Sequence, residues 1–210
     1  MYNKNKMIDN LELIKPLLNF EEKGDFYMLY VLKRKKDQPE GERDNHQSVR
    51  TIRTYCIRSI EQLEKRYDEI KMMCEMFKAR AYIHVQKQNH RDVSLNMMVA
   101  LAQRIQDGNL EQQSLFDSVV GQLKTLEKRW IVDVDMKDME VVMKIAKLIY
   151  HLRPEGPKVE TIIPTKNGYH LITNRFDVME FNKIMSLQGD VPDIQKKNPT
   201  LLFLPNSLED

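Results

Sequence analysis

The sequence predicts an α/β protein of the α+β type, and three patterns in its 210 residues carry that prediction. Short segments rich in β-branched and aromatic residues alternate with longer segments whose apolar residues recur every three or four positions. The C-terminal half follows the order strand, helix, strand, strand, helix, strand. An Asn-Gly pair separates two of these strand segments, as in a β-hairpin.

The composition excludes some functional classes. A chain of this length with 41% hydrophobic residues can bury a core, so disorder is not expected. The charges nearly balance, with 33 Lys and Arg against 31 Asp and Glu, so nucleic-acid binding requires a local patch. The cysteines, Cys56 and Cys74, lack the spacing of a metal site, and no apolar run approaches the roughly 18 residues of a membrane span. We therefore expect a reduced, cytoplasmic protein that has no membrane partner.

Residues 1–126 are predicted to form an N-terminal α/β unit. Its elements are strands at 26–32, 50–58 and 81–86 and helices at 60–78, about 91–108 and 112–124. A polar segment near residues 35–48 contains Gly and Pro without periodicity, and we expect an exposed loop there. The methionines of the helices, such as Met97 and Met98, are expected to pack in the core.

Residues 127–210 are predicted to form the second unit, and we expect the two units to pack into one compact structure. Its strands are expected at 130–135, 159–164, 169–173 and 200–204, and its helices at 139–152 and 177–185. This βαββαβ order is that of ferredoxin-like and RNA-recognition folds. In that topology the first and third strands are central neighbours, the helices cover one sheet face, and the other face can stay open.

The strand at 130–135 reads Trp-Ile-Val-Asp-Val-Asp, and its alternation places Asp133 and Asp135 on one face. Two neighbouring carboxylates repel each other, and a divalent cation removes that conflict, so we expect Mg²⁺ or Mn²⁺. His170 on the third strand is expected to project beside them, and Gly168 to let a phosphate approach the backbone. A turn-forming acidic pair and a solvated histidine are the alternatives.

These two motifs resemble those of the archaeo-eukaryotic primase superfamily, which includes the primase-polymerases. That family carries an hhhDhD strand and then a small-x-His strand, here residues 130–135 and Gly168-Tyr-His170. The resemblance implies an RRM-like palm packed against an N-terminal α/β unit, as in archaeo-eukaryotic primases. It also implies catalytic roles: Asp133 and Asp135 hold the divalent ions, and His170 contacts the phosphates of an incoming nucleotide.

The activity implied by the resemblance is transfer of a nucleotide from an NTP or dNTP to a nucleic-acid 3′-hydroxyl, in replication or repair. The substrates would be a nucleoside triphosphate and a DNA or RNA template and primer. The small size of the chain also fits a partner such as a replication helicase or another replication protein. The family adds a third metal-binding acid on a late strand; residues 200–204 contain none, and Asp193 is the candidate.

Several cations are weaker candidates. Lys166 and Arg175 flank the third strand and are candidate phosphate ligands, and the candidates for nucleic-acid contacts are Arg80, His84, Lys87 and Arg91. Solvent-exposed loops explain them equally well.

Other functions stay open. The main alternative is a catalytically degenerate RRM-like protein that binds nucleic acid or a partner. An ordinary RNA-recognition domain displays stacking aromatics where this chain has acids. A rolling-circle initiator needs two histidines around one apolar residue, and the chain has only Ile83-His84-Val85.

Overall fold

The computed structural model describes residues 7–38, 49–109, 114–123, 128–187 and 189–206, and it is an α+β arrangement of two antiparallel sheets. The larger sheet contains β1 (Ile8–Asp9), β2 (Asp25–Arg34), β3 (Val49–Ile57), β4 (Arg80–Ile83), β5 (Gln88–Asn89) and β10 (Thr200–Leu204). The smaller contains β6 (Trp130–Val134), β7 (Val159–Pro164), β8 (Tyr169–Thr173) and β9 (Asp193–Gln195). The helices are α1 (Leu11–Ile14), α2 (Ile60–Met76), α3 (His90–Gln106), α4 (Leu115–Gln122), α5 (Met139–His151) and α6 (Val178–Ser186).

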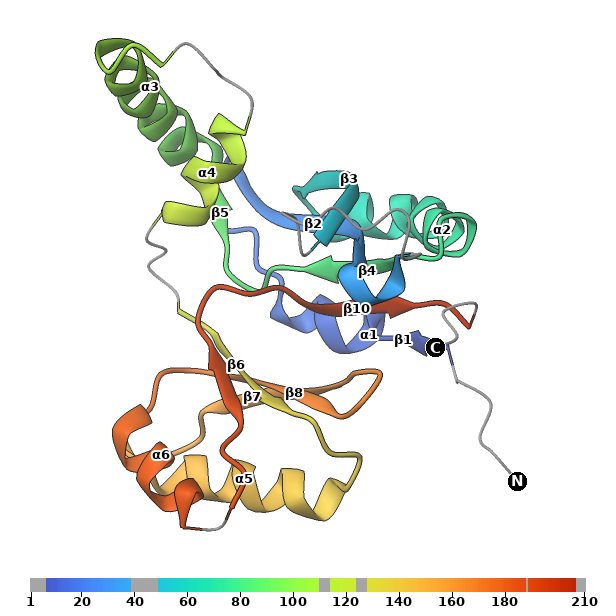
Figure 1. Cartoon of the computed structure of the whole chain (residues 1–210), viewed down its shortest axis with the longest axis vertical. Helices are drawn as coiled ribbons and strands as arrows, with labels where there is room; N and C mark the ends of the chain where they lie inside the picture. Colours follow the sequence, from blue (N-terminus) through green and yellow to red (C-terminus); the bar gives the residue numbers. More distant parts are fainter. Residues whose placement is uncertain (1–6, 39–48, 110–113, 124–127, 188, 207–210) are drawn as a thin grey trace.

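The larger sheet follows the order β1-β10-β4-β2-β3 and has helices on both faces (Figure 1). The side chains of β2 point alternately to the two faces of the sheet, which explains this arrangement. Its residues Tyr27 and Leu29 are buried in one core cluster with α2, whereas Phe26 and Met28 are buried in another with α3 and α4. The predicted strands at 26–32 and 50–58 and the predicted helices of this unit are confirmed within a few residues.

Helix α2 shows how local sequence sets an element. Ser59 caps it, since its Oγ accepts a hydrogen bond from the Gln62 amide at 3.1 Å. Apolar side chains then recur on one face, and Leu63 and Ile70 are fully buried. Of the loop predicted near 35–48, residues 35–37 form a short 3-10 turn whose Asp37 is nearly buried, and residues 39–48 lie outside the described part.

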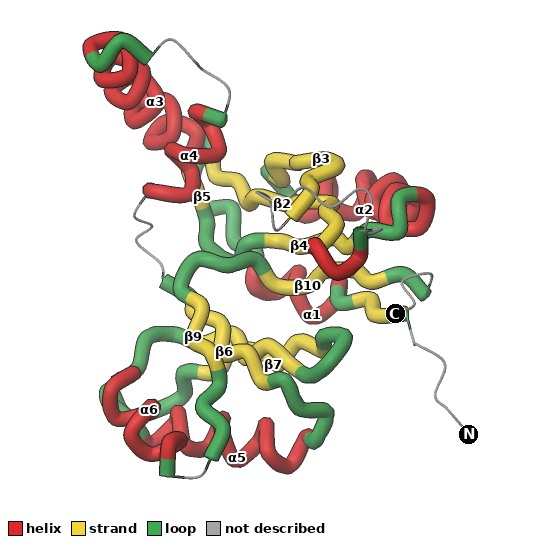
Figure 2. Tube along the Cα trace, viewed as in Figure 1, coloured by secondary structure: helices red, strands yellow, loops and turns green. Residues whose placement is uncertain are grey.

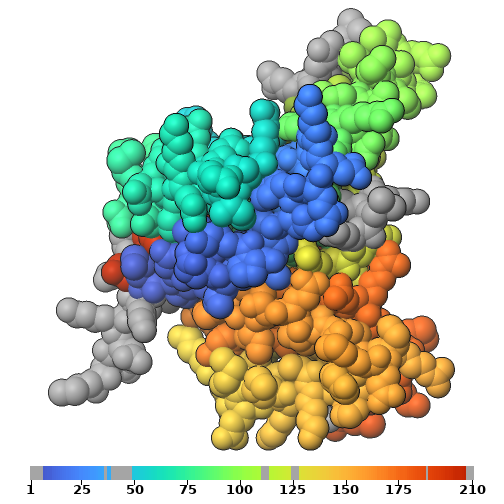
Figure 3. Space-filling model, turned by 180° about the vertical axis from the view of Figure 1, so that it is seen from behind, coloured from blue at the N-terminus to red at the C-terminus, as the bar shows by residue number. Residues whose placement is uncertain are grey.

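The smaller sheet has the order β7-β8-β6-β9, so its first and third strands are the central neighbours, as predicted (Figure 2). Val132 and Leu171 pack with α5 and α6 on one face. On the other face, Ile131 and Ile172 belong to the same core cluster as residues of the larger sheet. The face predicted to be open is therefore partly covered by the N-terminal unit, which packs directly on it (Figure 3).

The last predicted strand forms, but it pairs with strands of the other sheet. Residues 200–204 form a strand, but β10 pairs with β4 and β1 in the larger sheet, and β9 takes the fourth place in the smaller. All five residues of β10 are buried, which suits an inner strand with both faces covered. The division at residue 127 therefore fits β6 to β9, but the chain returns to the first unit at Thr200.

The hairpin of β7 and β8 has the predicted strands but a different turn. Neither Asn167 nor Gly168 adopts the positive φ of a two-residue Asn-Gly turn. A four-residue loop closes the hairpin, with the Thr165 amide donating to the Gly168 carbonyl at 2.8 Å. Glycine is required at 168 because a Cβ there would lie 1.8 Å from the carbonyl oxygen of Val134 on β6.

Two polar side chains tie the sheets together. The nearly buried Asn10 donates from Nδ2 to the carbonyls of Pro164 and Leu201, each at 2.9 Å. Arg129 donates to the Leu17 carbonyl at 2.8 Å and pairs with Glu160. Within the described ranges, no helix is both long and apolar enough to cross a membrane.

Candidate active site

A cavity of about 510 Å³ lies where the two sheets face each other. The smaller sheet and its hairpin contribute Asp133, Asp135, Lys166, His170 and Gln195 to its lining. The larger sheet and the residue after β4 contribute Tyr30, Arg34, Thr51, Arg80, Tyr82 and His84. The cavity thus has one acidic wall and one wall with aromatic and basic side chains.

The acidic wall is built on the pairing of β6 with β8. Asp133 and His170 are directly opposed across the two strands, so their side chains share one face. His170 Nε2 lies 3.4 Å from one oxygen of Asp133, and Gln195 Nε2 donates to the other at 3.2 Å. The hydrogen bond from His170 lowers the Asp133 pKa more than burial raises it, and the charge of Arg34 lowers it further. Asp133 is therefore an ionised carboxylate near neutral pH.

Thr200 holds the ring of His170 from the opposite sheet. Its Oγ1 lies 2.9 Å from His170 Nδ1, and both residues are buried. This contact leaves Nε2 as the ring nitrogen that faces Asp133. The row of Thr, His and Asp has the order of a hydrolase triad, but the Thr200 side chain is fully buried and cannot reach a substrate. Thr200 is thus a support for the histidine.

Asp135 follows β6 directly and is exposed on the same cavity as Asp133. Asp193 is the direct partner of Asp133 on β9 and lines a second hollow of about 320 Å³, to which Asp133, Asp135 and Asp190 also contribute. Within the described part of the chain, no group of three or more His, Cys, Asp and Glu is arranged to hold a metal ion. The carboxylates that line the cavity of about 510 Å³ are Asp133 and Asp135. Mg²⁺ is commonly held by one or two carboxylates, with water and phosphate oxygens completing its shell, so this donor set fits such an ion.

The opposite wall supplies positive charge. Arg34 is exposed and lies with its guanidinium 5.7 Å from the ring centre of Tyr82. Arg80 is almost fully buried and bound to Asp37 at 2.5 Å, so its charge is already balanced. Lys166, on the hairpin loop, lines the cavity from the side of the acids. Arg34 and Lys166 are thus the cations best placed for an anionic ligand.

Not every candidate residue reaches the cavity. Lys87 forms an ion pair with Asp25, at 3.2 Å. Arg91 lies in the first turn of α3, and Arg175 lies just beyond the C-terminal end of β8, away from the hairpin loop. None of these three residues lines the cavity.

Two further candidates have surroundings that change their expected roles. His84 lines the cavity, but burial lowers its pKa to about 4, so it is neutral at neutral pH and does not attract phosphate as a cation. Gly168 is buried against Val134, so its missing side chain makes room for β6; that it lets a phosphate approach the backbone stays a prediction.

Sequence reasoning missed Arg34, Gln195 and Thr200. Arg34 shares the alternation of Tyr30 and Leu32 on β2, which is the one signal that could have placed it on the cavity face. The other two lie on strands whose partners the sequence does not specify.

No protein-family model, curated protein or solved structure matches the chain significantly.

Proposed function

We propose that the protein is a divalent-metal-dependent nucleotidyltransferase of the primase-polymerase type, with β6 to β9 as an RRM-like palm. It transfers a nucleotide from an NTP or dNTP to the 3′-hydroxyl of a DNA or RNA primer. The observation that carries the proposal is the cavity itself, where Asp133 and Asp135 meet His170 on one wall and Arg34 on the other. Opposed walls of this kind suit a ligand that is both metal-bound and anionic, such as a nucleoside triphosphate.

In this proposal Asp133 and Asp135 hold Mg²⁺ or Mn²⁺, which neutralises phosphate charge and polarises the reacting oxygens. Arg34 and Lys166 line the cavity and attract the outer phosphates. His170 has its Nδ1 occupied by Thr200, so its Nε2 is the atom able to reach a phosphate oxygen when the contact with Asp133 loosens. The partly buried ring of Tyr30, which lines the same cavity, offers a surface for the base or the sugar.

The second candidate is a catalytically degenerate protein that uses the same surface to bind nucleic acid or a partner. One observation favours it: although Asp193 lines a hollow beside Asp133 and Asp135, no group of three or more His, Cys, Asp and Glu in the described part of the chain is arranged to hold a metal ion. A two-metal reaction needs enough carboxylates to hold both ions, and a site with two acids can bind nucleotide without extending a primer.

Calorimetric titration of a nucleoside triphosphate with Mn²⁺ tests the site. The wild type is compared with a double Asp133→Asn, Asp135→Asn variant and with Asp68→Asn, an exposed acid on α2, as the control. Binding by the wild type and the control that is lost in the double variant supports the proposal. Absence of nucleotide binding in the wild type, with retained binding of a fluorescent single-stranded oligonucleotide, favours the degenerate alternative.

A further inference from the structure

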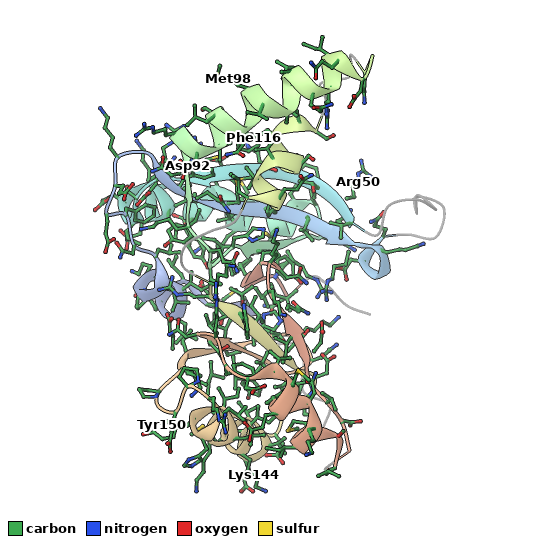
Figure 4. The ribbon with its side chains drawn as sticks, turned by 90° about the vertical axis from the view of Figure 1, so that its left-hand side faces the viewer. Arg50, Asp92, Met98, Phe116, Lys144 and Tyr150 are labelled. Atoms are coloured by element: carbon green, nitrogen blue, oxygen red, sulfur yellow. The ribbon has the colours of Figure 1, made fainter. Side chains whose placement is uncertain are left out.

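Helix α3 has two apolar faces. The inner one contains Val93, Met97 and Leu101, which pack with α4 and with Phe26 of β2. The outer stripe consists of exposed residues: Leu95, Met98, Val99, Ala102 and Ile105. Met98 was expected in the core, yet it is 69% exposed. Its side chain points away from Phe116, a residue of α4 (Figure 4).

The spacing of the outer stripe is that of a helix-pairing seam. Leu95, Met98, Ala102 and Ile105 are separated by three, four and three residues, as the a and d positions of a heptad are. Val99, beside this line, is 71% exposed. The other face of this helix is already packed, and an exposed apolar row of this size is comparable to the largest apolar patch of a typical monomer, which is often functional.

We infer that the outer stripe of α3 is a homodimer interface, in which it packs antiparallel against the same stripe of a second copy. The stripe itself carries no charge, so two copies meet without like-charge repulsion. Helix α3 also projects from the body of the protein, as Figures 1 and 3 show, and its first residue directly follows β5. Antiparallel pairing therefore places the two bodies at opposite ends of the paired helices.

Arg91 selects the antiparallel orientation. It lies seven residues before Met98, so it extends the stripe by one heptad position, and its side chain is exposed. Parallel pairing would place Arg91 against Arg91 of the second copy. Antiparallel pairing instead brings it to the C-terminal turn of the opposing helix, whose unpaired carbonyls favour a cation.

The area fits a weak dimer. The four large side chains, exposed by 52 to 71%, bury on the order of 450 Å² per chain when covered. A pair therefore buries about 900 Å² in total, below the roughly 1,200 Å² of stable interfaces and in the range of weak, transient ones. We therefore expect a dissociation constant on the order of 100 μM.

A second exposed apolar row, on α5, is a worse candidate for self-association. Met139, Met143 and Tyr150 line a shallow hollow there, with Lys144 and Lys147 beside them. Figure 4 shows Tyr150 and Lys144 at the far end of the molecule from Met98. Lys144 lies near the middle of this row, so antiparallel pairing would bring the Lys144 side chains of the two copies close together. Their like charges would repel each other.

Sedimentation equilibrium between about 5 and 500 μM protein, a range that brackets the expected dissociation constant, tests the inference. The wild type is expected to shift from monomer to dimer over this range. Met98→Lys stays monomeric, whereas Met143→Lys on α5 and Met179→Lys on α6, both exposed methionines, dimerise as the wild type does. Ala102→Leu, which fills the seam, tightens association by at least threefold.

Either of two results overturns the inference: a wild type that is monomeric at 500 μM with Ala102→Leu also monomeric, or a dimer that Met143→Lys abolishes and Met98→Lys does not. Circular dichroism and the thermal midpoint check that each variant folds. The orientation is read from spin labels at Asp92→Cys, an exposed residue in the first turn of α3, in a Cys56→Ser background that keeps Arg91. They lie roughly 25–30 Å apart in the antiparallel pair, from the 1.5 Å rise per residue, and within about 15 Å in a parallel one.

Discussion

Replacing Gly168 with alanine tests how the two central strands of the smaller sheet are held together. The added Cβ would lie 1.8 Å from the Val134 carbonyl oxygen, and contacts under 3.0 Å essentially never occur at real Cβ atoms. The two strands must therefore separate by at least 1.2 Å, the difference between these distances, and the contacted atoms are backbone, which does not yield easily. We expect a loss of about 3 kcal/mol in the free energy of unfolding. For a chain of this length that corresponds to a fall of about 6–12 °C in Tm.

The assay is urea and thermal denaturation followed by circular dichroism, with Gly121→Ala as the matched control. Gly121 lies in α4, where an added Cβ meets nothing within 4 Å, so alanine there is expected to be neutral or to stabilise by up to about 1 kcal/mol. Gly168→Ala moves Val134 and with it the adjacent Asp133, so nucleotide binding should weaken as well. A Gly168→Ala protein as stable as the wild type would refute the close approach of β6 and the hairpin loop.

Three other changes have defined outcomes. Asp37→Ala leaves the buried Arg80 without its partner and should cost about 3–5 kcal/mol in urea denaturation, whereas Asp68→Ala, in an exposed pair, should cost less than about 0.5 kcal/mol; equal losses would contradict the buried pair. His84 has a lowered pKa, so between pH 6.5 and about 4 the unfolded chain binds a proton that the folded chain does not, and stability falls as the pH falls. His84→Gln should remove up to about 3 kcal/mol of that loss at pH 4, and an unchanged pH profile would exclude a buried neutral ring. Thr200→Val removes the bond to the site histidine and should cost about 1–2 kcal/mol, with a changed ¹⁵N tautomer signal for that ring; an unaltered signal would show that Thr200 does not hold it.

The local elements were predictable because their patterns are local. The alternation in residues 130–134 placed Asp133 on the face away from α5, and the structure pairs it with His170. The hairpin strands of β7 and β8 agree with prediction to the residue. A helix with a good N-cap and an apolar stripe, such as α2, is likewise visible in the sequence.

The long-range partners were not predictable from the sequence. The apolar run of β10 is compatible with either sheet, and its choice depends on β1 and β4. The three residues of β9 are too few and too polar to show a strand pattern. Half of the candidate site comes from the larger sheet, so Arg34 and Thr200 entered it only through this tertiary pairing.

Primer extension tests the central proposal most directly. A labelled primer on a template is incubated with nucleoside triphosphates and Mn²⁺ or Mg²⁺, and products of the wild type are compared with those of Asp133→Asn, Asp135→Asn and the control Asp68→Asn. The proposal predicts extended products from the wild type and the control, and a loss of at least a hundredfold in both site variants. Extension that persists unchanged in the site variants, or a wild type that binds nucleotide but never extends a primer, would contradict it.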